Sequence, residues 1–271
     1  MPINLYPRFS RYPHDMPAGQ LDTVWVRVVA EDGTWGLGQC AFGEPVSAFI
    51  NTVIAPIIEG QNCMAIEHLN DLIVRVSQRF GTSGTASTAM SGVDLALWDL
   101  KGKILNQPVY SLLGGPVREF ITCYATSDDL DWSQELGFTK FKITNPSHYS
   151  DGDAGIKAVI DHVSQARERV GAEHDLMINP VMSYNFEFAQ RLLEHLRPYN
   201  LRWLEEPLVP TDNDGLARLR KSAPWVAIAT GEDHHGRHAF LDLVEKRAAD
   251  ILQPDLNWGG GLTEAMKIHS I

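Results

Sequence analysis

The stretch DLMINPVMSYNFEFAQRLLEHLRPYNLRWLEEPL, residues 175–208, decides the fold. It begins with a short apolar run that ends on Asn179, continues as an amphipathic segment, and closes with a second apolar run that ends on Glu205. Short apolar strands that alternate with amphipathic helices are typical of a parallel sheet that is buried on both faces. The stretch therefore predicts a strand, a helix and a second, parallel strand.

The same rhythm continues on both sides of this stretch, over residues 119–271. In chain order, the predicted strands are FITCYAT, TKFKIT, DLMINPV, LRWLEEPL, VAIATGE and DILQPDLNW. Six βα units of this kind form either an open doubly wound sheet or an incomplete TIM-like barrel. No glycine-rich phosphate fingerprint follows the first strand, which argues against a dinucleotide-binding fold. We therefore predict an α/β fold whose second domain is a partial (β/α) barrel.

Residues 1–118 have a different pattern, which predicts an α+β domain. β-branched and aromatic residues alternate around EDGTWG within residues 22–42, which is a strong hairpin signal. Helix is predicted from about Pro45 to Arg79, where GTSGTAST interrupts it. A second helix is predicted over AMSGVDLALWDLKGKIL, because its apolar residues recur near helical spacing, and Pro108 ends it.

Composition narrows the functional classes. The chain has 44% apolar and 21% charged residues, as a globular protein does, and its formal net charge of −11 argues against a nucleic-acid surface. Its three cysteines contain no C-x-x-C pair, and no apolar run approaches the roughly 18 residues that span a bilayer. We expect a cytoplasmic protein with no membrane segment. An acidic protein that handles an anionic substrate needs a cation at its site.

Polar residues stand at the predicted strand ends, where an α/β barrel carries its chemistry. In chain order they are Lys140 and Lys142, Asn179, Glu205, Glu232 and Asp255. A single acid at such a position is most simply a helix cap or a solvated loop residue. Acids and amides at several successive strand ends instead predict one convergent site, and their oxygen atoms suit a hard cation, Mg²⁺ above all.

These residues carry a family resemblance that covers nearly the whole chain. FKIT, LMINP, WLEEP, TGED and ILQPDLNWGGGLTE, in this order, resemble the enolase superfamily in its mandelate racemase branch. EDGTWGLGQCAFGEPV and DGDAGI resemble the L-rhamnonate dehydratase group within that branch. The resemblance implies an α+β capping domain and linker helix over residues 1–118 and a modified (β/α)7β barrel over 119–271. It implies a hydro-lyase that converts an acid sugar to a 2-keto-3-deoxy acid with Mg²⁺.

The resemblance also implies roles for the strand-end residues. It makes Asn179, Glu205 and Glu232 metal ligands, and it makes Asp255, Lys142 and Lys140 catalytic. Lys140 and Lys142 resemble the family's K-x-K pair, although a lysine solvated at the barrel rim is an equal alternative for each. Asp255 matches the aspartate that orients the family's catalytic histidine, which lies on the following strand.

Three departures from the family pattern shape the expectations. Asn179 replaces an aspartate, so we expect weaker metal binding rather than none. Asp233 stands where the rhamnonate group usually has a histidine. The chain ends after the sixth unit, before the strand with the catalytic histidine, and begins late, so the resemblance implies truncation at both ends.

Three readings of the function stay open. The leading one is an acid-sugar dehydratase that acts on a small aldonate and forms a homo-oligomer. The second is a catalytically impaired or non-catalytic relative that binds sugar acids or partner subunits. The third is a racemase or cycloisomerase of the same superfamily, which shares the proton abstraction.

Overall fold

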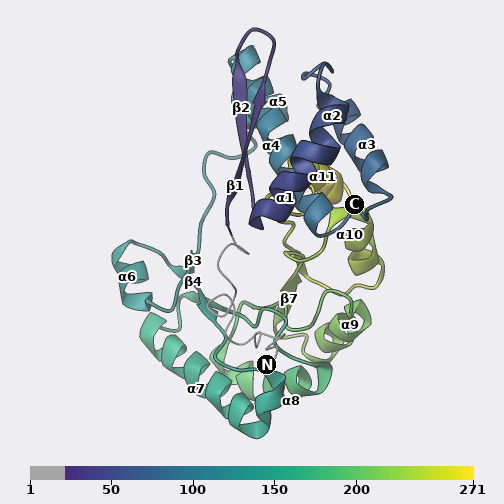
Figure 1. The fold of residues 1–271 in the computed structure, drawn as a ribbon. Coiled ribbons are helices and arrows are strands. Elements are labelled where there is room, and N and C mark those ends of the chain that lie inside the picture. The colour runs from purple at the N-terminus through teal and green to yellow at the C-terminus, as the bar shows by residue number, and fades with distance from the viewer. Residues whose placement is uncertain (1–21) are drawn as a thin grey trace, which may run out of the picture. The chain divides into compact units, whose positions relative to one another are not determined.

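The computed structural model describes residues 22–271, and its contacts divide them into two compact units (Figure 1). The sheet unit comprises residues 121–231 and 242–253, and the hairpin unit comprises 22–120, 232–241 and 254–271. No helix of the described chain is long and apolar enough to cross a membrane.

The sheet unit is built on six parallel strands that lie in chain order. The strands are β3 (Ala125–Thr126), β4 (Lys140–Thr144), β5 (Asp175–Asn179), β6 (Trp203–Glu205), β7 (Ala227–Thr230) and β8 (Ile251–Leu252). A doubly wound sheet reverses its strand order at a switch point, whereas a barrel keeps it sequential. The observed order therefore confirms the predicted partial barrel.

Amphipathic helices join these strands. They are α6 (Leu130–Glu135), η3 (Tyr149–Asp151), α7 (Gly152–Val170), α8 (Phe186–Leu196), η4 (Arg197–Tyr199) and α9 (Asn213–Ser222), and α10 (Gly236–Glu245) follows β7. Helices α7, α8 and α9 lie side by side along the sheet (Figure 1). Their apolar faces cover strands such as β5, whose Leu176, Met177 and Ile178 are fully buried. This burial on both faces explains the continuous apolar runs of the sequence.

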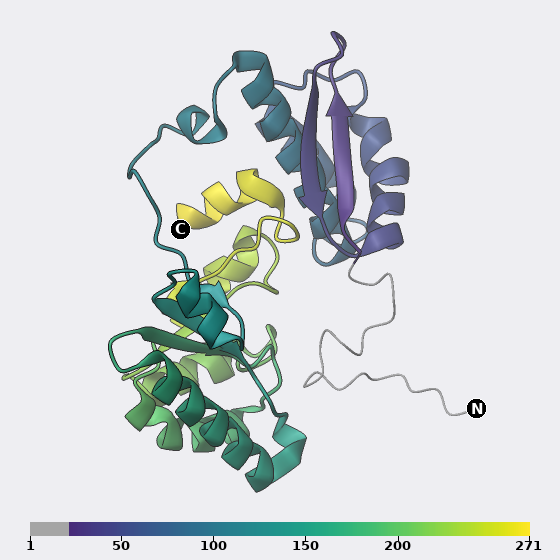
Figure 2. The same ribbon diagram turned by 90° about the vertical axis from the view of Figure 1, so that its left-hand side faces the viewer.

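The hairpin unit begins with the predicted antiparallel pair, β1 (Val24–Val29) and β2 (Trp35–Cys40). Its helices are α1 (Gly43–Phe49), η2 (Ile50–Ile54), α2 (Ala55–Ile58), α3 (Ile66–Ser77), α4 (Thr85–Leu105), α5 (Val109–Leu112) and α11 (Gly261–His269). The hairpin lies flat against α4 (Figure 2). The contact is close because a Cβ atom on Gly38 would come within 2.0 Å of the carbonyl oxygen of Gly92.

Two helix boundaries differ from the sequence prediction. The predicted helix from about Pro45 to Arg79 is interrupted between α2 and α3, where Gly60 takes a φ of +74°. Helix α4 begins at Thr85, inside the stretch predicted as a break, because Gly84 with a φ of +59° already supplies the turn before it. A glycine tolerates these angles without strain.

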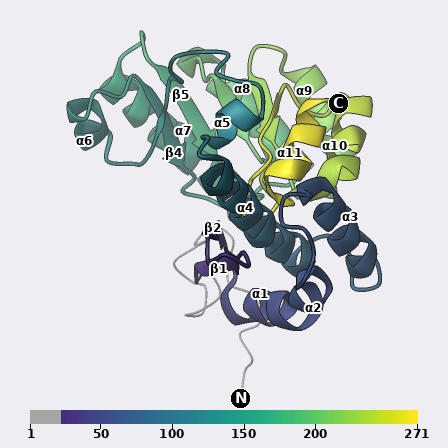
Figure 3. The ribbon, with the colours of Figure 1, turned by 90° about the horizontal axis from the view of Figure 1, so that it is seen from above.

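The last segment of the hairpin unit packs on α4, beside which α11 lies (Figure 3). The Ser87 hydroxyl donates to the carbonyl of Trp258, and the Gly260 N–H donates to the Ser91 hydroxyl. One carboxylate oxygen of Asp94 accepts from the Thr263 N–H at 2.9 Å. A polar stripe on α4 therefore holds the segment that starts α11.

Candidate functional site

Glu205 is the centre of a polar cluster in the sheet unit. It is the last residue of β6, and only 1% of it is exposed. Its Oε1 accepts from Lys142 Nζ at 2.6 Å and from Asn179 Nδ2 at 2.8 Å. Its Oε2 accepts from Trp203 Nε1 at 2.8 Å and from Gln253 Nε2 at 3.0 Å. Each oxygen of this buried carboxylate therefore has two donors, which matches its four lone-pair positions.

Lys142 supplies the positive charge of the cluster. It lies on β4, and its ammonium forms a buried ion pair with Glu205. The same ammonium lies 5.3 Å from the ring centroid of Tyr124, which packs edge-on against Trp203. The ring and the carboxylate together replace part of the water that a buried ammonium loses.

The amide of Asn179 has a fixed orientation. It is the last residue of β5, and its Oδ1 accepts from the Val181 N–H at 2.8 Å while its Nδ2 faces Glu205. The turn that carries Val181 is strained, since Val181 has a φ of +48° and Met182 a φ of +60°. Such left-handed angles are costly for a β-branched residue and persist only where surrounding contacts hold them. One of these contacts is the Asn179 oxygen.

Lys140 is placed away from this cluster. It is the first residue of β4, it is the register partner of Asp175, and it forms an ion pair with that residue. Both side chains are more than one third exposed. Lys140 therefore lies at the amino end of the sheet, where a parallel barrel does not carry its chemistry.

Two predicted site residues belong to the hairpin unit. Glu232 follows β7 and its backbone carbonyl accepts from Trp258 Nε1. Asp255 accepts from the Asn257 N–H at 2.6 Å, and burial raises its pKa. Burial and the nearby charge of Asp255 also raise the pKa of Asp233. The meeting of Glu232 with Asn179 and Glu205 stays a prediction.

Two members of the cluster were not assigned a role from the sequence. Trp203 precedes Glu205 by two residues, so both side chains lie on one face of β6, a signal that period-two spacing contains. Gln253 stands in the quoted QPD motif just after β8. Its approach to Glu205 depends on the register between strands, which the sequence does not state.

The donor set at Glu205 does not fit the magnesium ion that the family implies. Mg²⁺ takes oxygen ligands, whereas Asn179 presents an N–H group and Lys142 a positive charge. Among residues 22–271, no group of three or more His, Cys, Asp or Glu side chains is placed to hold a metal ion. As arranged, both oxygens of Glu205 are satisfied by protein donors, whereas the buried Oε1 of Gln253 has no hydrogen-bond partner among the described residues.

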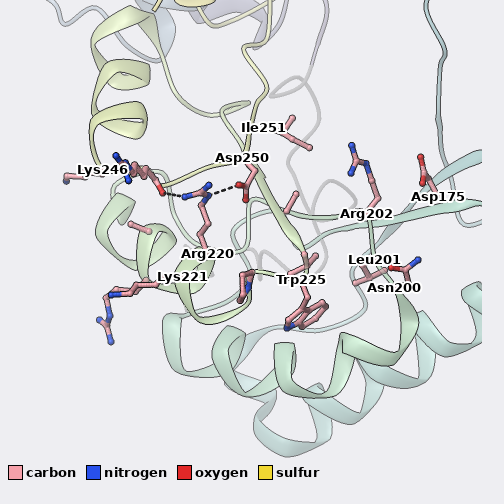
Figure 4. A pocket seen from close by; sticks show the side chains of 16 residues that line it. Asp175, Asn200, Leu201, Arg202, Arg220, Lys221, Trp225, Lys246, Asp250 and Ile251 are labelled. Carbon is pink, nitrogen blue, oxygen red and sulfur yellow. Dashed lines mark hydrogen bonds and ion pairs between the residues drawn. The ribbon is translucent and has the colours of Figure 1, made fainter.

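A cavity of about 1120 Å³ lies elsewhere in the sheet unit (Figure 4). Its lining includes Asp175, Arg202 and Ile251, which stand at or next to the amino ends of β5, β6 and β8. In the cavity lining, Arg220 Nε donates a hydrogen bond to Asp250 Oδ1 at 2.7 Å (Figure 4). Because chemistry in a parallel barrel lies at the carboxyl ends of the strands, this cavity is not the candidate site.

Comparisons with known proteins agree with the fold. The family model "Enolase C-terminal domain-like" matches residues 128–271, and "Mandelate racemase / muconate lactonizing enzyme, N-terminal domain" matches residues 5–114. The L-rhamnonate dehydratase of Saccharopolyspora erythraea is 39% identical over 271 residues, which are 100% of this chain and 70% of that protein.

Solved structures of related proteins have the same fold. Two crystal structures of the dehydratase from Gibberella zeae, one described as complexed with Mg, are 34% identical with TM-scores of 0.89. They match 92% of this chain, which spans 64% and 62% of theirs. The 3,6-anhydro-D-galactonate cycloisomerase of Zobellia galactanivorans is 31% identical with a TM-score of 0.84, over 91% of this chain and 70% of that one. One fold therefore hosts more than one reaction.

Proposed function

We propose a function from one premise: the chain belongs to the enolase superfamily, in its mandelate racemase branch, and is L-rhamnonate dehydratase-like. Its family activity is that of a hydro-lyase. The substrate class that we assign to this chain is a small acid sugar, L-rhamnonate or a related aldonate. The observation that carries the assignment is the Glu205 cluster, a buried charged group at the carboxyl end of a barrel strand.

The proposed reaction is a β-elimination. A base removes the proton on the carbon next to the aldonate carboxylate, and the 3-hydroxyl leaves as water after it takes up a proton. The enol that forms becomes the 2-keto-3-deoxy acid, so the products are this acid and one water molecule. The step is difficult because that proton is a very weak acid, and positive charge near the carboxylate stabilises the enediolate.

The residues of the sheet unit would contribute charge and position. Because Lys142 Nζ donates to Glu205 in a buried ion pair, we assign it the role of a fixed positive charge rather than that of the base. Asn179, Trp203 and Gln253 hold the carboxylate that holds Lys142. The proposed role of this cluster involves no metal ion, because the donor set at Glu205 does not fit one.

A specific observation favours a second candidate, a relative that binds acid sugars without turning them over. Asn179 Nδ2 donates to Glu205 at the position that the family resemblance assigns to a ligand aspartate. Loss of that carboxylate removes a ligand on which the family's chemistry depends, while the buried Lys142–Glu205 ion pair at the carboxyl ends of the strands remains.

One experiment separates these candidates. The chain is incubated with L-rhamnonate and a panel of its epimers, the keto acid is followed by NMR, and binding is followed by saturation-transfer NMR in the same samples. Turnover that is lost in Glu205→Gln but kept in the exposed control Gln190→Glu supports the dehydratase. Binding without turnover supports the second candidate. Neither binding nor turnover across the panel overturns the acid-sugar assignment.

Two further expectations stay predictions. A homo-oligomer would elute in gel filtration at a multiple of the 30.2 kDa chain mass. A cytoplasmic location is tested by cell fractionation.

A further inference from the structure

We propose that Lys142 and Asn179 together take the place of a divalent cation at Glu205, so that this cluster is built to stand without magnesium. The inference concerns the site of the proposed function, but it does not depend on turnover, because it is tested by ion binding. It therefore survives or fails independently of the acid-sugar assignment.

Charge is the first argument. A buried carboxylate such as Glu205 is costly unless a positive charge and hydrogen bonds compensate it. Lys142 Nζ supplies the positive charge at 2.6 Å from Glu205 Oε1. Three neutral N–H donors complete the hydrogen bonding of the two carboxylate oxygens. A metal ion that coordinates Oε1 would have to displace Lys142 or Asn179 from it, and it would be repelled by the ammonium.

The orientation of the amide is the second argument. For Asn179 to offer its oxygen to a metal ion bound at Glu205, the amide would have to turn over, because its Nδ2 now faces that carboxylate. Its Nδ2 would then face the Val181 N–H, and its oxygen would face Glu205 Oε1, so both present hydrogen bonds would be replaced by repulsions. The strained turn cannot easily adjust, since Met182 is also held, by a 2.7 Å bond from its N–H to the carbonyl of Glu206.

An aspartate at position 179 would reverse this situation. One of its oxygens could still accept from Val181, but the other would face Glu205 Oε1 across a hydrogen-bond distance. Two carboxylates against one ammonium leave an excess negative charge, which a cation resolves. Asn179→Asp is therefore expected to create a demand for a divalent ion that the natural chain lacks.

Binding of Mn²⁺, a probe for Mg²⁺, tests the inference on the full chain. Free Mn²⁺ is counted by its paramagnetic resonance signal in titrations of the natural chain, Asn179→Asp, Glu205→Gln and the control Gln190→Glu. The control makes the same amide-to-acid change on the exposed face of α8. Thermal unfolding of each protein with excess Mg²⁺ and with a chelator provides a second readout.

We expect Asn179→Asp to bind Mn²⁺ at least about ten-fold more tightly than the natural chain, as a gained carboxylate ligand implies. We expect Mg²⁺ to raise the melting temperature of Asn179→Asp. We expect the control Gln190→Glu to show neither tighter Mn²⁺ binding nor a higher melting temperature. We also expect Glu205→Gln to leave the Mn²⁺ binding of the natural chain unchanged. The inference is overturned if Asn179→Asp gains no affinity, or if the natural chain binds Mn²⁺ in a way that Glu205→Gln abolishes. If Asn179→Asp does not fold, the comparison of the natural chain with Glu205→Gln decides alone.

Discussion

At the scale of single residues, the identity of one side chain changes the chemistry of a cluster. An amide and a carboxylate have nearly the same shape, but Asn179 donates a hydrogen bond where an aspartate would add a second negative charge. Asn179 therefore supports the ion pair of Lys142 with Glu205 instead of competing with Glu205 for its positive charge. Its energetic contribution is open to measurement.

We expect Lys142→Met to lower the free energy of unfolding by about 3–5 kcal/mol, since it leaves Glu205 buried without its cation. The matched change Lys140→Met removes an ion pair that is more than one third exposed, and we expect a loss of only about 0–1 kcal/mol. Urea denaturation of both variants measures the difference. Equal losses of unfolding free energy in the two variants would mean that Glu205 does not depend on Lys142. The double variant Lys142→Met with Glu205→Gln should lose less unfolding free energy than the sum of its two single changes.

Asp94 gives the molecule a pH dependence. Burial raises the pKa of its carboxyl to about 6, and one oxygen has no hydrogen-bond partner among the described residues. The folded chain therefore keeps this proton at pH values at which the unfolded chain has already lost it. As a result, Asp94 lowers the free energy of unfolding progressively from about pH 4 to about pH 6, and by a constant amount at higher pH.

Asp94→Asn removes this titration and keeps an oxygen for the Thr263 N–H. We expect its unfolding free energy, relative to the natural chain, to rise by about 2 kcal/mol between pH 4 and pH 7. Urea denaturation across this range measures the difference. A difference that stays constant with pH would show that Asp94 titrates alike in the folded and unfolded chain.

At the scale of elements, hydrophobic periodicity predicted the strands and the hairpin, but it did not predict a polar contact surface on α4 or one helix interruption. The hairpin and the six strands were recognisable because β-branched alternation and short apolar runs reflect burial. The polar stripe of Ser87, Ser91 and Asp94 on α4 was not, although these residues recur at i, i+4 and i+7, because small polar residues on a helix are more often solvent-exposed than packed. The interruption between α2 and α3 was missed for a related reason: a single glycine breaks a helix only in some contexts.

The packing of β2 on α4 depends on glycines that face the helix. A Cβ atom on Gly38 would come within 2.0 Å of one helix backbone atom and 2.6 Å of another. We expect Gly38→Ala to destabilise the chain by about 1–3 kcal/mol or more through overpacking. Gln39→Ala, on the exposed face of the same strand, is expected to change stability by less than about 0.5 kcal/mol. Thermal unfolding compares the two, and a Gly38→Ala protein as stable as the control would contradict the close approach.

At the scale of the whole molecule, the sequential strand order explains why residues far apart in the chain meet. Lys142, Asn179, Glu205 and Gln253 come from four strands or their ends, and the parallel register brings them together. The sequence predicted three of these four, because polar residues at strand ends are visible in it. It did not predict which atoms would face each other, since amide orientation depends on the turn at Val181.

The most direct test of the account is a crystal structure of this chain grown with Mn²⁺ and measured for anomalous scattering. We predict no anomalous peak at Glu205, with Lys142 Nζ and Asn179 Nδ2 within hydrogen-bond distance of Oε1. An ordered ion that bridges Glu205 and the oxygen of Asn179, with Lys142 displaced, would contradict it.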